Sequence, residues 1–209
     1  MVVALVVRLS FVVWWQTNQL PAHGPFKFPD SESYWELGKQ IAAGEDYEFR
    51  SAQRQVFRTP GYPLLLAGMF QVIGMNAPPI AARLLGAVVG AFTVGTVFWL
   101  AKRTFNSTSA LIAAGMAAVY PGAIAISGLV LAEGLFTLWM LLQLIFWTYA
   151  IGERYRNADS KDFPGNREGE LHRFPKRVFI TALMSGIAAG LATLTRPSWL
   201  LFTPRAIVA

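Results

Sequence analysis

The sequence predicts an all-α protein, a polytopic bundle of about five transmembrane helices with a helical extracytoplasmic first loop. The first observation is composition: the 209 residues are 54% hydrophobic and only 14% charged, which is too apolar for an ordinary soluble domain. The second is the placement of the charges. Residues 84–101 and 178–195 carry none, and residues 104–152 contain only Glu133. We therefore treat residues 1–209 as a single membrane domain.

The first predicted span covers residues 2–20. This segment is short for a crossing, and Arg8 interrupts its apolar run. A cleaved signal peptide is the alternative, but no positive charge precedes Val2 and no small-residue cleavage site follows the apolar run. We expect the segment to remain attached as an anchor, and its abbreviated start favours a reading frame that begins upstream.

The later spans follow from the uncharged runs. A helix needs about 20 apolar residues to cross the ~30 Å hydrocarbon layer, so these runs accommodate one, two and one spans. Pro121 and Gly122 are expected to break the longest run. The spans are predicted at residues 83–102, 108–128, 131–151 and 177–195.

The first loop, residues 21–82, contains half of the acidic residues of the chain and two predicted short helices, at 31–43 and 64–76. The second helix decides the topology, because it is uncharged and could be mistaken for a span. Only residues 64–77 lie between Pro63 and Pro78, and they would form a helix of roughly 21 Å, too short for a crossing. We expect it to lie in the interface.

The basic residues set the predicted orientation. Lys102 and Arg103 follow one span, and the loop at 152–176 is rich in arginine and lysine, so both should be cytoplasmic. The first loop then lies outside, and Asp30 and Glu133 share that side. The predicted location is the cytoplasmic membrane of a prokaryote.

Several functions are disfavoured by composition. The chain has no cysteine, and His23 and His172 are far apart, so no metal motif or thiol nucleophile is present; we assign no cofactor, and metal dependence stays open. The net charge of +6 arises from loops beside spans, so no nucleic-acid partner is expected. The glycine pairs at 86 and 90 and at 186 and 190 are typical of close helix packing.

Two carboxylates are candidates for chemistry. Asp30 lies in the acidic cluster of the first loop, although a helix N-cap is an alternative role for it. Glu133 is the only acid in a long apolar run, where a carboxylate is costly. Its alternative role is that of a solvated acid at a helix start.

The candidate binding residues surround a proline-rich stretch. Arg58 precedes Thr59-Pro60-Gly61-Tyr62-Pro63, which we expect to form a stiff turn that holds the guanidinium at headgroup depth. A guanidinium there suits a lipid phosphate, and Tyr62 could add a hydroxyl. General attraction to anionic headgroups is the alternative. Arg83 is a second phosphate candidate or an interfacial anchor, and Tyr34 lies on the first short helix.

In their order along the chain, these motifs resemble the GT-C superfamily of membrane glycosyltransferases, specifically the family of dolichyl-phosphate-mannose protein mannosyltransferases and bacterial aminoarabinose transferases. The resemblance covers nearly the whole chain. The motifs that carry it are Asp30-Ser31-Glu32-Ser33-Tyr34, Arg58-Thr59-Pro60-Gly61-Tyr62-Pro63-Leu64-Leu65, Ala82-Arg83-Leu84-Leu85-Gly86, Leu100-Ala101-Lys102-Arg103-Thr104-Phe105 and Leu131-Ala132-Glu133-Gly134-Leu135-Phe136.

The resemblance implies an inverting transfer of a hexosyl- or pentosyl-type sugar from a polyprenyl-phosphate donor to a lipid, glycan or protein acceptor on the outer face. Asp30 matches the general base, Arg58 the residue that holds the phosphate, and Glu133 a second acid of the cavity. Tyr34, Tyr62 and Arg83 are the further substrate-binding candidates. Related families differ in metal dependence, so a divalent metal stays open, and membrane lipids are the surrounding partners.

The chain departs from the family pattern in length, because such enzymes usually have several more spans and a further outer domain. We therefore interpret it as an N-terminal fragment or a truncated gene product. Two alternatives follow from the residues: a transporter or channel that uses Glu133 as an intramembrane ion or proton site, or a non-catalytic membrane remnant.

Overall fold

A computed structural model of the protein describes residues 1–18, 25–50, 58–159 and 176–201, and all of the regular elements in these ranges are helical. The predicted all-α class is therefore confirmed. The elements are α1 (Val2–Asn18), α2 (Pro29–Ala43), α3 (Gly61–Ile73), α4 (Pro79–Thr104), α5 (Ser107–Val119), α6 (Pro121–Ser127), α7 (Glu133–Asp159), α8 (Lys176–Thr195) and the 3-10 helix η1 (Pro197–Leu201).

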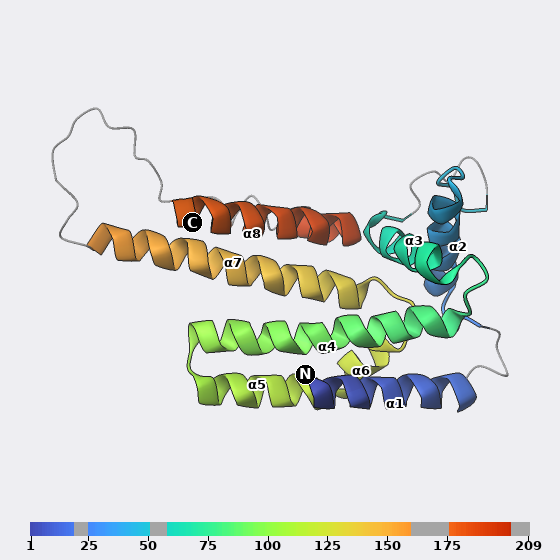
Figure 1. The fold of residues 1–209 in the computed structure, drawn as a ribbon, viewed down its shortest axis with the longest axis horizontal. Coiled ribbons are helices and arrows are strands. Elements are labelled where there is room, and N and C mark those ends of the chain that lie inside the picture. Colours follow the sequence, from blue (N-terminus) through green and yellow to red (C-terminus); the bar gives the residue numbers. More distant parts are fainter. Residues whose placement is uncertain (19–24, 51–57, 160–175, 202–209) are drawn as a thin grey trace.

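The long helices lie side by side and the two short helices of the first loop cover one end (Figure 1). α4 packs against α7, which packs against α8, while α1 and α5 lie along the other side of α4. α2 and α3 lie across the bundle at the end where α7 begins and α8 stops. We call this the capped end.

The apolar runs form membrane-length helices as predicted. α4, α7 as far as Gly152, and α8 are each long and apolar enough to cross a bilayer, and α5 with α6 forms a further candidate that is bent by 57°. The protein is therefore an integral membrane protein. α1, with 17 residues, is shorter than these candidates, about 26 Å at the rise of an α-helix, so its crossing stays a prediction.

Two helices differ from the predicted division of the apolar runs. Pro121 bends the third span rather than separating it from the fourth, because α6 begins at this residue and continues to Ser127. α7 continues to Asp159, well past the predicted span end at 151, since hydropathy marks where a span ends but not where its helix ends. The rest of the predicted 152–176 loop, residues 160–175, lies outside the described residues.

The predicted turn at Gly61–Pro63 is instead the first turn of α3, which spans Gly61–Ile73 rather than 64–76. Proline is tolerated there because the first amide groups of a helix have no partner within it. The helix ends at Gly74, which has a φ of 107°, a backbone conformation that glycine adopts easily and other residues rarely do. α3 thus contains 13 residues and lies across the capped end, as expected for an interfacial helix (Figure 1).

The capped end is held by an aromatic core between α2 and α3. The rings of Trp35 and Phe70 meet edge to face at 4.7 Å between centroids. A Cβ on Gly38 would lie 2.8 Å from the Cβ of Leu66, so the two helices approach closely at this glycine. The same core continues into α4 and α7, and it fixes α2 and α3 on the bundle.

Glycine packing is confirmed for one of the two predicted pairs. A Cβ on Gly86 would lie 2.5 Å from the carbonyl oxygen of Ser127, and one on Gly90 would lie 2.7 Å from Nε of Arg8. A Cβ on Gly186 or Gly190 would meet no atom of a neighbouring helix within 4 Å in the described part of the chain. The packing prediction is therefore wrong for this pair within these residues.

Arg8 lies deep in the bundle, where it compensates for the Pro121 break. Its Nη1 donates to the carbonyl of Ala118 at 3.1 Å and its Nη2 to that of Ala117 at 3.2 Å. Pro121 has no N–H to give to Ala117, so that carbonyl would otherwise lack its helical partner. The side chain that interrupts the first apolar run therefore satisfies the end of α5.

Replacement of this arginine tests the interpretation. Arg8→Met should lower the melting temperature of the protein in detergent, because each buried carbonyl left unpaired costs about 1–3 kcal/mol. Arg50→Met, at a side chain that is 60% exposed, is the control and should melt like the wild type. An unchanged melting temperature for Arg8→Met would show that the carbonyls need no partner here.

Candidate active site

The segment between Arg58 and Gly61 rests on the end of α8. The hydroxyl of Thr59 donates to the carbonyl of Thr195 at 2.9 Å, across 136 residues of sequence. A Cβ on Gly61 would lie 2.7 Å from the carbonyl oxygen of Leu194, so only glycine permits this approach. The last carbonyls of a helix lack intrahelical partners, which makes the end of α8 a natural acceptor.

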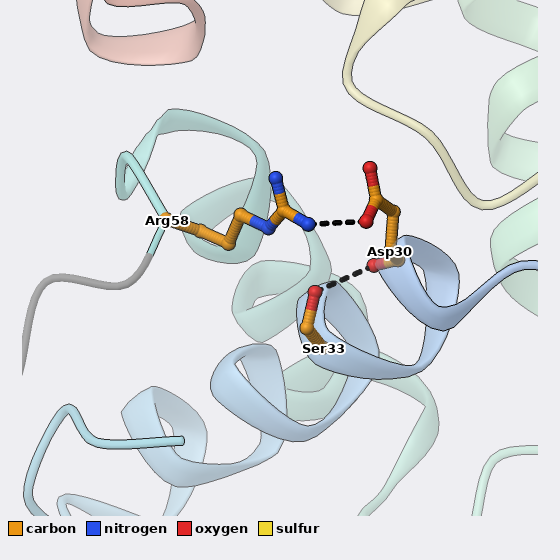
Figure 2. Close-up of polar contacts among 3 residues, drawn as sticks. All are labelled: Asp30, Ser33 and Arg58. Atoms are coloured by element: carbon orange, nitrogen blue, oxygen red, sulfur yellow. Dashed lines mark hydrogen bonds and ion pairs between the residues drawn. The ribbon is translucent and has the colours of Figure 1, made fainter. Parts of the chain in front are cut away.

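Asp30 and Arg58 form an ion pair at the capped end (Figure 2). Nη2 of Arg58 donates to Oδ1 of Asp30, and the hydroxyl of Ser33 donates to the main-chain carbonyl of Asp30 at 2.8 Å. The side chains are 27% exposed for Arg58 and 50% exposed for Asp30, so a substrate can reach both.

The alternative that Asp30 caps α2 is wrong. The N-cap residue is Phe28, no side chain caps the helix, and Asp30 is the second residue of the helix proper. A carboxylate in the first turn is favoured by the helix dipole, but its hydrogen bond goes to Arg58 instead of to the backbone. The side chain is therefore oriented toward the site.

Glu133 and Arg196 form a second ion pair at the same end. Glu133 is the first residue of α7, and its Oε1 lies 3.5 Å from Nη1 of Arg196. Both side chains are partly exposed. The guanidinium of Arg196 also lies 5.9 Å from the centre of the Phe136 ring.

Sequence reasoning missed Arg196 as a site residue. A signal was present, because it is the first charge after the uncharged run 178–195, at the end of the span that faces Asp30. The η1 helix that follows folds against α7, where the Trp199 indole donates to the side chain of Gln143 and packs against Phe136. This contact holds Arg196 beside the start of α7.

Tyr34 lies near both ion pairs. The guanidinium of Arg58 lies 5.5 Å from the centre of its ring, and the ring of Tyr62 meets it edge-on at 5.2 Å. Burial raises the pKa of the Tyr34 hydroxyl, and the charges of both ion pairs are near enough to act on it. We name this group the charged cluster; its members are Asp30, Tyr34, Arg58, Tyr62, Glu133 and Arg196.

Tyr62, a member of the charged cluster, and Tyr47, which contacts it, are both partly or fully buried. Tyr62 is 4% exposed, and burial, followed by the proximity of Tyr34 and Glu133, raises the pKa of its hydroxyl, so it is a neutral phenol. Tyr47, which sequence reasoning did not single out, donates its hydroxyl to the carbonyl of Arg58 at 2.8 Å. It therefore fixes the backbone from which the Arg58 side chain extends.

Arg83 has a different environment from the arginines of the charged cluster. It is 2% exposed, its Nη1 donates to Oε1 of Gln16 at 2.6 Å, and its Nη2 donates to the carbonyl of Pro25. These contacts connect the end of α1 and the start of the first loop to α4. The geometry supports a structural tie, and its predicted role in phosphate binding gains no support.

Metal ligands are not gathered at this site in the described residues, where no group of three or more histidine, cysteine, aspartate or glutamate side chains lies close enough to hold an ion. His23 and His172 fall outside the described ranges. The carboxylates of Asp30 and Glu133 each face an arginine instead.

The fold and the charged cluster define a class: a polytopic membrane protein with paired carboxylates and arginines at one end of its bundle. A family model described as dolichyl-phosphate-mannose-protein mannosyltransferase matches residues 62–208. Because the match covers more than half of the chain, the protein belongs to this family, and it is a membrane glycosyltransferase of the GT-C superfamily. Searches of curated proteins and of solved structures gave no match.

The family assignment confirms the predicted resemblance and favours a mannosyltransferase-like enzyme over the transporter or channel alternative. Glu133 and Arg196 lie within the matched residues. Asp30 and Arg58 precede them, so their roles depend on the geometry of the charged cluster rather than on the match.

The tyrosine environment predicts a loss of stability at high pH. Burial raises the pKa of Tyr47 to about 12 from 10.0, so the folded protein holds this proton more tightly than the unfolded chain does. Its contribution to stability is complete below the unfolded pKa and is lost as the pH rises through about 12. Thermal unfolding in detergent should therefore show a steep decrease in stability over this interval.

Tyr47→Phe should reduce the steepness of that decrease, although Tyr34 and Tyr62 will leave part of it. At neutral pH the variant should lose about 0.5–1.5 kcal/mol through the missing hydrogen bond. The same pH dependence in the variant and in the wild type would contradict the assignment to Tyr47.

Proposed function

We propose that the protein transfers a sugar from a polyprenyl-phosphate donor to an acceptor hydroxyl, with Asp30 as general base and Arg58 as the phosphate-binding residue. The observation that carries this proposal is the charged cluster, in which two ion pairs of a carboxylate and an arginine lie near Tyr34 at one end of a membrane bundle. An arginine can bind the charged lipid phosphate, and a carboxylate can take the proton of the hydroxyl nucleophile.

The proposed reaction is a single displacement. The acceptor hydroxyl oxygen attacks the anomeric carbon of the sugar while its proton passes to the carboxylate of Asp30. The bond between the anomeric carbon and the phosphate oxygen breaks, and the polyprenyl phosphate leaves with the electron pair. Attack opposite the leaving group inverts the configuration of the anomeric carbon.

The arginines stabilise the charge that develops on the departing phosphate. Arg58 is well suited to this, because Tyr47 and the Thr59–Thr195 contact hold its backbone and Tyr34 lies beneath its guanidinium. A guanidinium stays charged and presents paired donors to phosphate oxygens. Arg196, which also lies near Tyr34, is the second donor in this proposal. Preorganised donors of this kind supply much of the rate enhancement in group transfer.

Glu133 and the tyrosines complete the proposed site. Glu133 keeps Arg196 beside the start of α7 and can accept hydrogen bonds from the sugar hydroxyls. Tyr34 and Tyr62 are held neutral by burial, so they line the site without adding charge. The acceptor is a lipid, a glycan or a protein.

The proposed orientation places the capped end outside the cell, in the cytoplasmic membrane of a prokaryote. Lys102 and Arg103 lie at the last turn of α4, at the opposite end of the bundle (Figure 1). Short loops rich in lysine and arginine stay in the cytoplasm, so the charged cluster faces outward.

Replacement of the base is the direct test of the mechanism. Asp30→Asn should reduce sugar transfer by about 10²- to 10⁴-fold, because the acceptor hydroxyl loses the group that takes its proton. The measurement is transfer of radiolabelled sugar in membranes. Glu32→Gln removes the same charge from the same helix and should leave transfer near wild type. Unchanged turnover in Asp30→Asn would refute the role of the base.

The orientation can be tested separately, because the chain has no cysteine of its own. Glu45→Cys, after α2, and Thr108→Cys, at the start of α5, place thiols at exposed positions near opposite ends of the bundle. An impermeant maleimide should label Glu45→Cys in intact cells and Thr108→Cys only after permeabilisation. The reverse pattern would invert the proposed orientation.

A further inference from the structure

The end of the bundle opposite the capped end carries a second arrangement of charge, around Arg103 in the last turn of α4 (Figure 1). The guanidinium of Arg103 lies 4.7 Å from the centre of the Tyr149 ring of α7. The hydroxyl of this tyrosine accepts a hydrogen bond from the indole of Trp99 at 3.1 Å. One arginine and two aromatic side chains therefore meet where α4 packs against α7.

Gly152 makes room for the guanidinium. A Cβ at this position would lie 2.3 Å from Nη2 of Arg103, so the arginine crosses α7 at a residue that has no side chain. The same Nη2 is 3.5 Å from the main-chain carbonyl oxygen of Thr148, a distance at the outer limit for a hydrogen bond. The contact with the Tyr149 ring and the space at Gly152 therefore set the position of the side chain.

Most of the donors of Arg103 are unused. A guanidinium has several N–H groups, and the long contact with Thr148 engages only one of them. Within the described part of the chain, Arg103 forms no ion pair with a carboxylate. It is exposed, whereas Arg8 and Arg83 are buried and donate inside the bundle. An anion can therefore reach a guanidinium that is already held in place.

Tyr149 offers a second donor at the same place. Its hydroxyl oxygen accepts from Trp99, and a hydroxyl can donate its own proton at the same time. Among the described residues, Tyr149 donates this proton to no acceptor. The ring that supports the guanidinium thus also presents an O–H group.

The depth of these side chains suits the headgroup region of a membrane. Trp99 and Arg103 are four residues apart on α4, so they share one face and lie about 6 Å apart along the axis. Tryptophan and tyrosine favour the boundary between acyl chains and headgroups. With Trp99 at that boundary, the guanidinium lies one turn further out, at the depth of the phosphates. The indole is 40% exposed, so it offers an apolar surface to an acyl chain.

We propose that Arg103 and Tyr149 bind the phosphate of an anionic phospholipid in the leaflet at this end of the bundle. The guanidinium presents paired donors to the phosphate oxygens, and the phenol adds one more. The lipid is a diacyl phospholipid with a negative headgroup, such as phosphatidylglycerol. The ammonium of phosphatidylcholine would bring a further positive charge to Lys102 and Arg103. This site is separate from the charged cluster and does not depend on the proposed function.

Replacement of the arginine tests the site directly. Native mass spectrometry of the protein in detergent gives the apparent Kd of the first phospholipid bound, and the wild type should bind phosphatidylglycerol more tightly than phosphatidylcholine. Arg103→Gln should raise the Kd for phosphatidylglycerol by about five- to twentyfold, because hydrogen bonds to the charged phosphate are lost. An unchanged Kd would overturn the site.

Lys102→Gln is the matched control. Lys102 precedes Arg103, is exposed as well, and lies over the ring of Phe98 at 5.9 Å rather than over Tyr149. Its replacement removes the same charge from the same turn, so the Kd should stay within about twofold of the wild type. Equal losses in Lys102→Gln and Arg103→Gln would mean general attraction to the end of α4, and the specific site would be overturned.

Two further variants keep the charge and change the geometry. Gly152→Ala places a Cβ against Nη2, so the flexible arginine must move away from Tyr149. Arg103→Lys removes the planar pair of donors. Each should raise the Kd for phosphatidylglycerol by about three- to tenfold. Wild-type binding in both would show that charge alone is sufficient, which contradicts the proposed geometry.

Inorganic phosphate distinguishes a lipid from a soluble ligand. Millimolar phosphate should leave bound phosphatidylglycerol in place, because the free ion has no acyl chain to lie on the apolar surface beside Trp99. Displacement by phosphate would assign the site to a soluble anion and would overturn the lipid.

Discussion

The arrangement of the charged cluster depends on one backbone contact, the seating of the segment from Arg58 to Gly61 on the last residues of α8. Thr59 binds the carbonyl of Thr195, and the absence of a side chain at Gly61 lets the two backbones meet. Arg58 directly precedes Thr59 in the sequence, and Arg196 directly follows Thr195. The first loop and the chain after α8 thereby bring Arg58 and Arg196 to the same end of the bundle. Arg58 lies beside Asp30 of α2, and Arg196 lies beside Glu133 of α7.

Arg8, Arg58, Arg83 and Arg196 divide into two groups by their partners. Arg8 and Arg83 are each 2% exposed, and their donors go to main-chain carbonyls or to an amide side chain, so they serve the fold. Arg58 and Arg196 are partly exposed, and each forms an ion pair with a carboxylate. Both terminal nitrogens of Arg8 and of Arg83 donate within the protein, although Nε of each has no hydrogen-bond partner in the described residues, whereas a partly exposed ion pair can exchange its partner. Burial therefore separates the two arginines that tie the fold together from the two that belong to the proposed site.

The break in the third span illustrates how the bundle accommodates such a cation. Pro121 cannot donate to Ala117, and α6 leaves the axis of α5 at 57°. The guanidinium of Arg8 occupies the space beside Gly90 and binds the carbonyls left at the end of α5. A polar side chain in an apolar helix and a proline in another would each be costly alone, and together they satisfy each other. The fold therefore brings together two features that look unrelated along the sequence.

The sequence by itself determined the fold class, the helices α4, α7 and α8, and the family, because bilayer thickness fixes how long an uncharged apolar run must be and because the motifs lie in a recognisable order. It also singled out Asp30, Arg58 and Glu133. Tertiary structure alone decided that Asp30 is paired rather than a cap, that Arg83 is buried, and that Tyr47 and Arg196 belong beside the site. These outcomes depend on which partner each polar group finds. Partners separated by as many as 136 residues are chosen by how helices pack, which no local pattern records.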